Sequence, residues 1–284
     1  TVEYNQNSEG GKVWRIMPRR NPAVNKSWIS NRTRMLYQDL SRNRLTDGIV
    51  DGADVTLDTA RKAAAAAIDK AGKVALIASG HATLEDNAAL LKLAEELGGK
   101  AEVFGGSWLR VGTADGVALS GDPVANRAGL KLLGIPDNLD ELVRRGREFD
   151  AVVVFQHDLI GADPAKAAAL AQIPARVVLS AWRDATAAQA TVALGVRAWA
   201  EVRGTMVNCQ NRIQLMQACP VLPNPQLEPA WRELAALAGA NWTSELDAFR
   251  HAQALAPALA GVTYRAVGPQ GRILESAAVA AAAG

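Results

Sequence analysis

The chain alternates between two kinds of apolar segment, and this alternation predicts its fold. Short runs rich in β-branched residues, such as 151–155 and 176–180, are typical of strands that are buried on both faces. Between them lie longer segments whose apolar residues recur three and four positions apart, as amphipathic helices require. Strand and helix follow one another from Gly52 onward, which predicts an α/β fold: a parallel, doubly wound sheet covered by helices on both faces.

The expected elements follow from these runs and from the residues that end them. Helices are predicted at residues 56–71, 83–97, 122–133, 139–147, 165–171, 228–238 and 244–255, where capping residues, an opening proline or a closing glycine set several of the ends. Strands are predicted at 74–78, 101–104, 151–155, 176–180, 191–194 and 262–267, with weaker alternation at 108–119.

Residues 1–50 follow a different pattern, which predicts a small β-rich arm. The alternating residues 13–17 stop at Pro18, which indicates one strand of a hairpin. A turn-rich connection follows at 19–25. The next segment has a mixed pattern in which one helical face carries Met35, Leu36 and Leu40.

A polar stretch at 198–214 fits neither the helical nor the strand pattern. An apolar run leads into an acid and then Gly204, and amide side chains follow at Asn208, Asn211 and Gln214. Glycine permits a positive φ, and amide side chains bond backbone groups in turns, so we expect a constrained turn here. Whether such a turn serves a ligand or only joins two elements is left open by the residues alone.

Size and composition are those of a globular protein. With 284 residues, 49% of them hydrophobic, the chain has room for one large domain or two small ones. Its longest apolar runs, 63–68 and 277–283, are shorter than the roughly 18 residues of a membrane-spanning helix. We expect no secretory signal, and because the sequence starts at Thr1 we expect a processed or excised fragment. Two cysteines and three histidines favour a reducing compartment without disulfides.

Charge is distributed unevenly along the chain. The net charge is +2, but residues 1–50 hold nine Lys or Arg against four Asp or Glu, which gives +5 there and −3 in the remainder. A basic arm can bind nucleic acid or an acidic neighbouring subunit. No RNA-binding or helix-turn-helix signature accompanies it, so we expect a protein partner and no nucleic acid.

Polar or bulky residues follow three of the predicted strands. Open parallel sheets bind ligands at the carboxyl ends of their strands, so these residues are candidates for a ligand crevice. The alternative is that they satisfy loop and helix-end groups only. The residues are Ser79, Gly80 and His81; Gln156, His157 and Asp158; Trp182, Arg183 and Asp184.

Common catalytic and metal motifs are missing from the sequence. It contains no G-x-S-x-G nucleophile motif, no P-loop, and no G-x-G-x-x-G after the first predicted strand. His157-Asp158 lacks an assigned nucleophile, and an isolated pair of this kind is usually structural. A four-iron cluster needs about four thiolate ligands, whereas Cys209 and Cys219 are the only cysteines. Their spacing fits no standard zinc site, so we predict that both are buried small hydrophobic residues.

Two segments resemble known redox proteins. Residues 11–25, Trp28-x-x-x-Arg32-x-Arg34 and 43–46 resemble the end of the cluster-binding domain in the large iron–sulfur subunit of bacterial NADH:quinone oxidoreductase, complex I. In that family the residue two positions after the tryptophan is normally the last cysteine ligand of a 4Fe–4S cluster, and here it is Ser30.

The second segment is similar to the third domain of the molybdopterin oxidoreductases, to which that subunit is related. The pattern usually has Glu-Gly where this chain has Gln210 and Asn211. The matching residues are Glu201, Gly204, Thr205, Asn208, Cys209, Arg212 and Gln214.

The resemblance implies a division of the chain and a degenerate cofactor site. Residues 1–50 are expected to be a basic remnant of the cluster-binding domain, and 51–284 a molybdopterin oxidoreductase-like α/β domain with a C-terminal helical extension at 220–284. No catalytic residue and no metal ligand is expected in this chain; 4Fe–4S clusters are expected in a partner chain or in a missing N-terminal part. The residues implied for the vestigial cofactor crevice are Ser79, Gly80, His81, His157, Asp158, Arg183, Gly204 and Asn208.

The implied function is that of a non-catalytic structural domain that supports electron transfer from NADH to quinone by scaffolding. The expected partners are other subunits of a respiratory complex, through which the chain is membrane-associated at the cytoplasmic face of the bacterial inner membrane. One alternative is the cofactor-binding part of a molybdenum or tungsten pterin oxidoreductase such as formate dehydrogenase. Another is a small-ligand-binding domain that uses the edge at His81 and His157.

Overall fold

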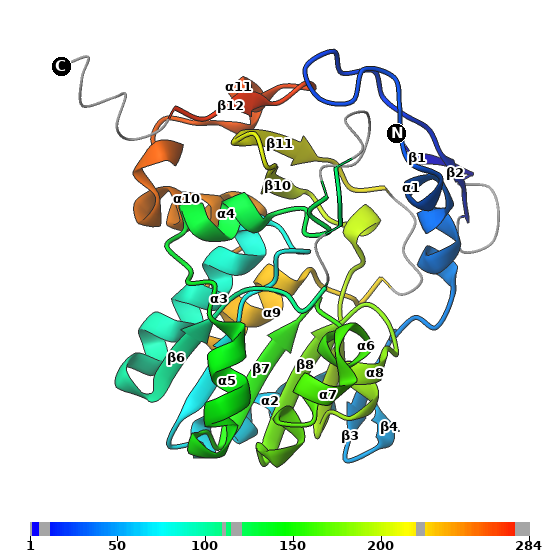
Figure 1. Cartoon of the computed structure of the whole chain (residues 1–284). Helices are drawn as coiled ribbons and strands as arrows, with labels where there is room; N and C mark the ends of the chain where they lie inside the picture. The colour runs from blue at the N-terminus through cyan, green and yellow to red at the C-terminus, as the bar shows by residue number, and fades with distance from the viewer. Residues whose placement is uncertain (1, 6–11, 110–111, 115–120, 220–224, 276–284) are drawn as a thin grey trace.

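A seven-stranded sheet forms the centre of the structure, a computed structural model that describes residues 2–5, 12–109, 112–114, 121–219 and 225–275 (Figure 1). The strand order is β4-β3-β9-β8-β7-β5-β6; the last five run parallel, and β3 is antiparallel to both β9 and β4. The predicted α/β fold with a mostly parallel sheet is therefore confirmed. The strands are β3 (Gly48–Val50), β4 (Ala53–Val55), β5 (Val74–Ile77), β6 (Ala101–Phe104), β7 (Ala151–Phe155), β8 (Ala175–Ser180) and β9 (Val192–Gly195).

Each central strand is buried on both faces, as its β-branched composition predicts. Along β7, Val153 and Phe155 belong to one hydrophobic cluster, whereas Val152 and Val154 belong to the other. This alternation is the period of two that a strand imposes on its side chains. The sheet thus separates two cores, and each core is closed by its own set of helices.

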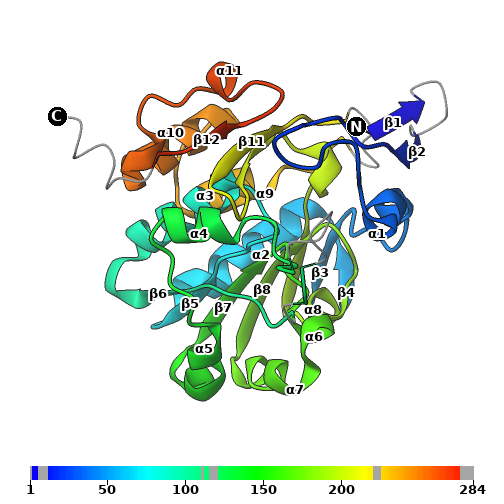
Figure 2. The ribbon, with the colours of Figure 1, turned by 45° about the horizontal axis from the view of Figure 1, so that its top comes forward.

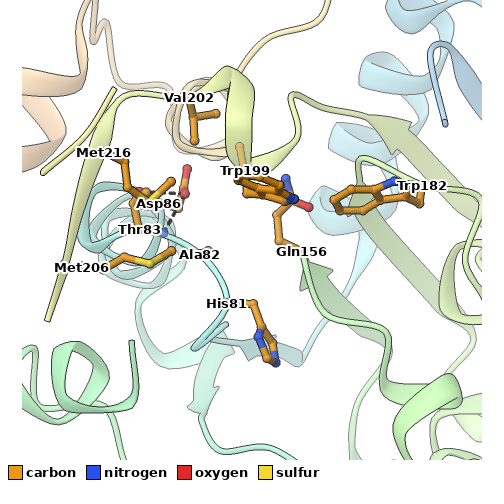
Figure 3. Close-up of a pocket in the computed structure, with 11 residues that line it drawn as sticks. His81, Ala82, Thr83, Asp86, Gln156, Trp182, Trp199, Val202, Met206 and Met216 are labelled. Atoms are coloured by element: carbon orange, nitrogen blue, oxygen red, sulfur yellow. Dashed lines mark hydrogen bonds between the residues drawn. The ribbon is translucent and has the colours of Figure 1, made fainter. Parts of the chain in front are cut away.

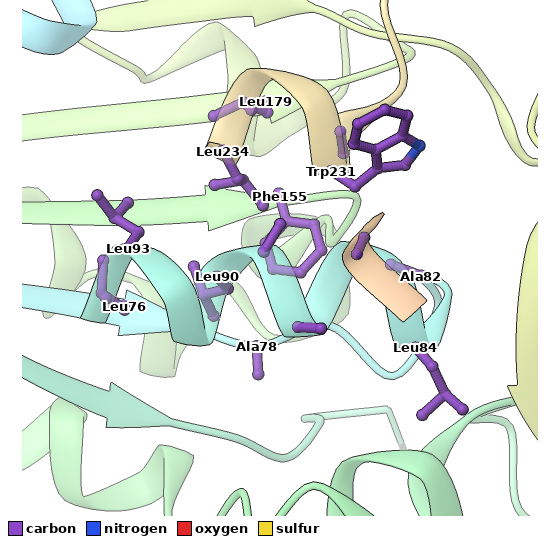
Figure 4. Packing of buried hydrophobic residues seen from close by; sticks show 14 of the residues in the cluster. Leu76, Ala78, Ala82, Leu84, Leu90, Leu93, Phe155, Leu179, Trp231 and Leu234 are labelled. Atoms are coloured by element: carbon purple, nitrogen blue, oxygen red, sulfur yellow. The ribbon is translucent and has the colours of Figure 1, made fainter. Parts of the chain in front are cut away.

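The larger core lies between the sheet and four helices, α2 (Leu57–Lys70), α3 (Leu84–Leu97), α9 (Ala230–Leu237) and α10 (Glu245–Leu255). Figure 4 shows Leu90 of α3 beside Phe155 of the sheet, and Leu179 of the sheet with Trp231 and Leu234 of α9 belong to the same cluster. The helices that cover the opposite face are shorter: α5 (Leu139–Arg145), α6 (Leu159–Ala162), α7 (Pro164–Ala167) and α8 (Ala185–Ala188). Single turns of 3-10 helix lie at η2 (Gly98–Lys100), η3 (Gly146–Glu148), η4 (Leu170–Gln172) and η6 (Pro257–Leu259).

The N-terminal arm lies at one side of the molecule (Figures 1 and 2). Its hairpin of β1 (Val2–Asn5) and β2 (Lys12–Ile16) confirms the predicted strand. It is followed by α1 (Asn31–Met35) and η1 (Leu36–Ser41). The proposed helical face around Met35 does not enter a core, since neither α1 nor η1 contains a buried residue. The central sheet takes up β3 directly after the arm, so it begins before residue 51.

A second small sheet corrects our interpretation of the polar stretch. Residues on both sides of the expected turn form the antiparallel strands β10 (Gly204–Val207) and β11 (Arg212–Met216), and β12 (Arg272–Ile273) pairs with β11. The strands were not predicted because only one side of this hairpin is apolar: Val207 and Ile213 are buried in the larger core. A 3-10 turn, η5 (Trp199–Glu201), precedes the hairpin.

Three predicted elements are wrong in extent or type. The helix expected at 165–171 is only α7, and the 3-10 turn η4 follows it separately. The helix expected at 122–133 is only α4 (Arg127–Leu132), because the Asn126 side chain bonds distant backbone instead of capping an earlier turn. The strand expected at 262–267 is the helical turn α11 (Tyr264–Val267), which Thr263 caps by accepting a hydrogen bond from the Ala266 amide. The expectation for 108–119 falls partly outside the described residues, and its described part contains no strand.

Among the described residues, no helix is both long enough and apolar enough to cross a membrane.

Candidate functional site

The sheet topology fixes where a ligand crevice is expected. Numbered in chain order, the five parallel strands lie in the order 2-1-3-4-5, and the order reverses between β5 and β7. In doubly wound sheets, ligands bind outside the carboxyl ends of the strands at this reversal. The residues that follow β5 include His81, and those that follow β7 are Gln156 and His157. Six of the predicted candidates therefore lie at the topological switch point: Ser79, Gly80, His81, Gln156, His157 and Asp158.

A pocket opens at this edge (Figure 3). The pocket is partly open, and its empty space of about 470 Å³ includes volume that belongs to the solvent. In Figure 3 the two methionines and the two tryptophans frame opposite sides of the opening. The pocket is mostly apolar, with few polar groups, as small-molecule sites usually are. Its lining consists of His81, Ala82, Thr83, Asp86, Gln156, Trp182, Trp199, Val202, Met206, Met216 and Ala230.

One histidine of the pocket lining, His81, contacts a second histidine, His157. The rings of His81 and His157 lie edge to face, with their centroids 5.4 Å apart. His157 is buried, and neither ring nitrogen has a hydrogen-bond partner. Burial, and secondarily the charge of His81, lowers the pKa of His157 to about 3, so its imidazole is neutral at physiological pH. Burial also lowers the pKa of His81, aided by the positive charge of Arg127.

Gln156 lies at the end of β7 in a strained conformation. Its φ is 46°, a left-handed value that is uncommon for any residue other than glycine. Three hydrogen bonds hold it there: its amide donates to the Leu179 carbonyl, its side-chain nitrogen donates to the Arg197 carbonyl, and its own carbonyl accepts from the Ser79 hydroxyl. Backbone strain that several hydrogen bonds maintain in this way is often found at ligand sites.

The first turn of α3 carries three consecutive buried polar residues, Glu85, Asp86 and Asn87. Asn87 bonds the amide and the carbonyl of Ser79 and so fixes the loop that carries His81. Asp86 accepts from the hydroxyl and the amide of Thr83 in a capping box. Its other oxygen accepts a 2.8 Å hydrogen bond from the Trp231 amide. This amide lies in the first turn of α9, where amides have no partner within the helix.

Glu85 holds the hairpin that forms one wall of the pocket. One carboxyl oxygen accepts a 2.7 Å bond from the Thr205 amide; the other accepts from the hydroxyls of Thr205 (2.8 Å) and Tyr264 (2.6 Å). Among the described residues no cation pairs with it. Burial therefore outweighs these hydrogen bonds and raises the pKa of Glu85 to about 7.

The other predicted site residues lie outside the pocket lining. Asp158 caps α6 and accepts from the amide and hydroxyl of Thr186. Arg183 pairs with Asp54 at the surface. Asn208 organises the hairpin turn by accepting from the amides of Gln210 and Arg212. These contacts are structural, and a ligand role for the three remains a prediction.

Ser79, Gly80 and Gly204 provide close backbone packing around the pocket. A Cβ at Gly80 would clash with a Val124 methyl group, and one at Gly204 would lie 2.8 Å from the Glu85 carboxylate. Sequence reasoning missed Met206 and Met216 as lining residues, because it did not predict the strands that carry them. Their alternation with buried Val207 and Ile213 was the available signal.

A buried ion pair joins the arm to the α/β domain. Arg44 makes two parallel hydrogen bonds to Glu201, of 2.9 and 2.7 Å, and the two side chains are only 6% and 4% exposed. Arg44 also donates to the carbonyls of Leu40 and Ala181, and Glu201 accepts from the Ala198 amide. We refer to this set as the Arg44–Glu201 clamp.

Among the described residues, no set of side chains fits an iron–sulfur cluster. Ser30, at the position where the resemblance implies a cysteine ligand, caps α1 by accepting from the Thr33 amide. Cys219 is buried as predicted, but Cys209 is exposed in the turn of the β10–β11 hairpin, so the prediction for Cys209 is wrong. Within the described part of the chain, no group of three or more His, Cys, Asp or Glu side chains could hold a metal ion.

Fold and site together define a doubly wound α/β domain to which a short N-terminal arm is clamped. Residues 5–38 match the family described as NADH-ubiquinone oxidoreductase NDSU1/NuoG-like, 4Fe-4S domain. The chain is also similar to the mitochondrial NADH dehydrogenase (ubiquinone) iron-sulfur protein 1 of Solanum tuberosum, with 47% identity over 47 residues. That match spans 16% of this chain and 6% of the potato protein, so the similarity concerns one short segment.

Proposed function

We propose that this chain is a non-catalytic structural domain of the large iron–sulfur subunit of an NADH:quinone oxidoreductase. In this proposal the 4Fe–4S clusters are held by another chain or by another part of the same polypeptide, and the α/β domain braces the arm beside them. The matched family and the potato relative support membership of a multi-subunit redox complex. Association with the membrane would then occur through the other subunits.

The Arg44–Glu201 clamp is the observation that carries this proposal. It ties the end of a segment resembling a cluster domain to a turn beside the pocket, with both charges almost fully buried. Burying two charges costs several kcal/mol, which the bidentate geometry and the additional hydrogen bonds offset. A contact of this kind fixes the position of one segment against the other, as a scaffold requires.

Substituting Arg44 in the assembled complex tests the proposal. Arg44→Met keeps much of the apolar stem but leaves Glu201 buried without a countercharge, at a cost of about 3–5 kcal/mol. We expect the amount of assembled complex on native gels to fall severalfold, while NADH oxidation per assembled complex stays unchanged. Adding Glu201→Leu removes the unpaired charge and should recover part of the assembly.

The matched control is Arg183→Met, which breaks a pair of exposed side chains with Asp54 and should be nearly neutral. Unchanged assembly combined with lower turnover per complex would point to a catalytic role and contradict the proposal. A wild-type chain that never co-purifies with iron–sulfur proteins would contradict it as well.

The pocket favours a second candidate, a small-ligand or pterin site, because His157, which contacts the lining residue His81, has two ring nitrogens without a hydrogen-bond partner. Molybdenum analysis and pterin fluorescence of the purified, denatured protein test this candidate, and stoichiometric metal would replace the scaffold proposal. Thermal-shift measurements with guanine nucleotides test the small-ligand form. If nucleotides do not raise the melting temperature of the wild type, and the variant with His81→Ala and His157→Ala gives the same result, the small-ligand candidate is excluded.

A further inference from the structure

The arm carries positive charge that the rest of the molecule does not neutralise. Between residues 10 and 46 the only acidic residue is Asp39. Arg15 pairs with Glu3 and Arg44 with Glu201, but six cations have no acidic partner among the described residues. Cations of the α/β domain are often paired, as Arg61 is with Glu233. The six unpaired cations are Arg19, Arg20, Lys26, Arg32, Arg34 and Arg42.

Large apolar side chains are exposed on the same segment. Trp14 is 54% exposed, Trp28 63% and Met35 48%, and Val24 is also exposed. Of the large hydrophobic residues that are exposed in the described structure, only Leu246 and Ile273 lie outside the arm. Tryptophan, methionine and arginine are the residues enriched at the centres of protein interfaces. The combination is typical of a surface that another protein covers.

The family match bears on the kind of protein that would cover this surface. Residues 5–38 match a 4Fe–4S domain, yet this segment contains no cysteine. Under the proposed function, the thiolate ligands come from outside this segment, and a cluster ligated by four thiolates adds negative charge to the protein that holds it. An arm with unpaired cations complements such a partner in charge.

We propose that the arm, through its exposed Trp14, Trp28 and Met35 and its unpaired cations, is the docking surface for an acidic iron–sulfur protein chain. The partner's identity rests on the proposed function; the existence of the surface rests on exposure and charge. Trp28 and Met35 supply apolar anchors, while the cations steer the encounter and fix its orientation.

A nucleic acid is the less suitable occupant. Single strands bind by stacking bases on aromatic rings in a basic groove. The arm exposes aliphatic residues as well, Met35 and Val24, which give little stacking and match an apolar protein surface better.

Binding of an acidic two-cluster 4Fe–4S ferredoxin to the purified chain tests the docking surface. Calorimetry at about 50 mM salt should detect complex formation that weakens as the ionic strength rises. The double variants Trp28→Ser with Met35→Ser, and Lys26→Glu with Arg32→Glu, should each weaken binding about tenfold or more. All four positions are exposed, so circular dichroism should report an unchanged fold.

Matched controls place the same changes on the α/β domain. Lys100→Glu with Lys131→Glu alters net charge equally at exposed, unpaired lysines, and Leu246→Ser removes an exposed apolar residue there. Absence of ferredoxin binding, equal losses in the controls, or tighter binding of oligo(dT) than of ferredoxin would each overturn the docking surface. The scaffold proposal has a separate readout, the assembly defect of Arg44→Met, so either can fail without the other.

Discussion

At the scale of single residues, Glu85 is unusual because its carboxyl group is buried without a cationic partner among the described residues. A carboxylate that is buried without a cation costs free energy when it ionises, even where three donors face it. The groups around it are Thr205 on β10, Tyr264 on α11 with Arg203 over its ring, Glu245 paired with Arg203, and Asp86. The pKa values of Asp86 and Tyr264 are raised too, chiefly by burial.

Glu85 makes stability depend on pH. Its pKa rises from 4.5 to about 7 on folding, so the native state binds more protons than the unfolded state between these values. The free energy of unfolding therefore falls as pH increases from about 4.5 to 7, by about 3 kcal/mol from this group. Glu85→Gln should remove this slope and be more stable than the wild type at pH 8, measured by urea denaturation across pH.

The glutamine can accept from the Thr205 amide and donate to one of the two hydroxyls, so the hydrogen bonds largely persist. Asp86 is common to both proteins and cancels in their difference. Parallel stability profiles for wild type and variant would contradict the assignment of the slope to Glu85.

Sequence reasoning at this scale found residues but not their partners. Glu201 and Gly204 were selected from a pattern, and both prove to be buried. That Glu201 binds Arg44 could not be read from the chain, because 157 positions separate the two. That both ring nitrogens of His157 lack a hydrogen-bond partner likewise depends on which segments surround this side chain.

At the scale of elements, the approach of β10 to α3 depends on one glycine. A methyl group at Gly204 would lie 2.8 Å from both the Glu85 carboxylate and the Thr83 side chain. Contacts this short force the hairpin away from the helix. Because β10 carries Met206, that displacement also alters the pocket wall.

Gly204→Ala should therefore destabilise the protein by about 1–3 kcal/mol in urea denaturation. Gly99→Ala is the matched control, because nothing lies within 4 Å of a Cβ at that position. We expect that control to be neutral or slightly stabilising, since alanine reduces the entropy of the unfolded chain. Similar losses in both variants would show that the contact with Glu85 is not the cause.

Elements were predictable where local pattern and tertiary packing agree. Thr83 caps α3, and the helix bears the expected apolar spacing. Prediction failed where a distant partner determines where a helix begins. The Asn126 side chain accepts a hydrogen bond from the Val207 amide of β10 and does not cap its own helix. It failed too at α11, where Tyr264 and Val267, three positions apart, are buried by a helical turn rather than by a strand.

At the scale of the whole molecule, the parallel core was predictable and the joining of its parts was not. Runs such as β7 are apolar on both faces, which only a sheet between two helical layers permits. The antiparallel strand β3 and the clamp below the arm leave no comparable periodic signal. Both depend on contacts between residues of the first fifty and residues near 200.

The pairing of β3 with β9 has a consequence for biosynthesis. Gly48 of β3 aligns with Leu194 of β9. During synthesis β3 is therefore made first among the strands of this sheet, but the edge that pairs with β9 stays uncovered until β9, the last parallel strand, has been made. Such late, non-local closure prolongs the exposure of an unpaired strand in the nascent chain. A ribosome-stalled chain ending at residue 190 should be cleaved by protease near residues 42–55, whereas one extended through the whole domain should resist.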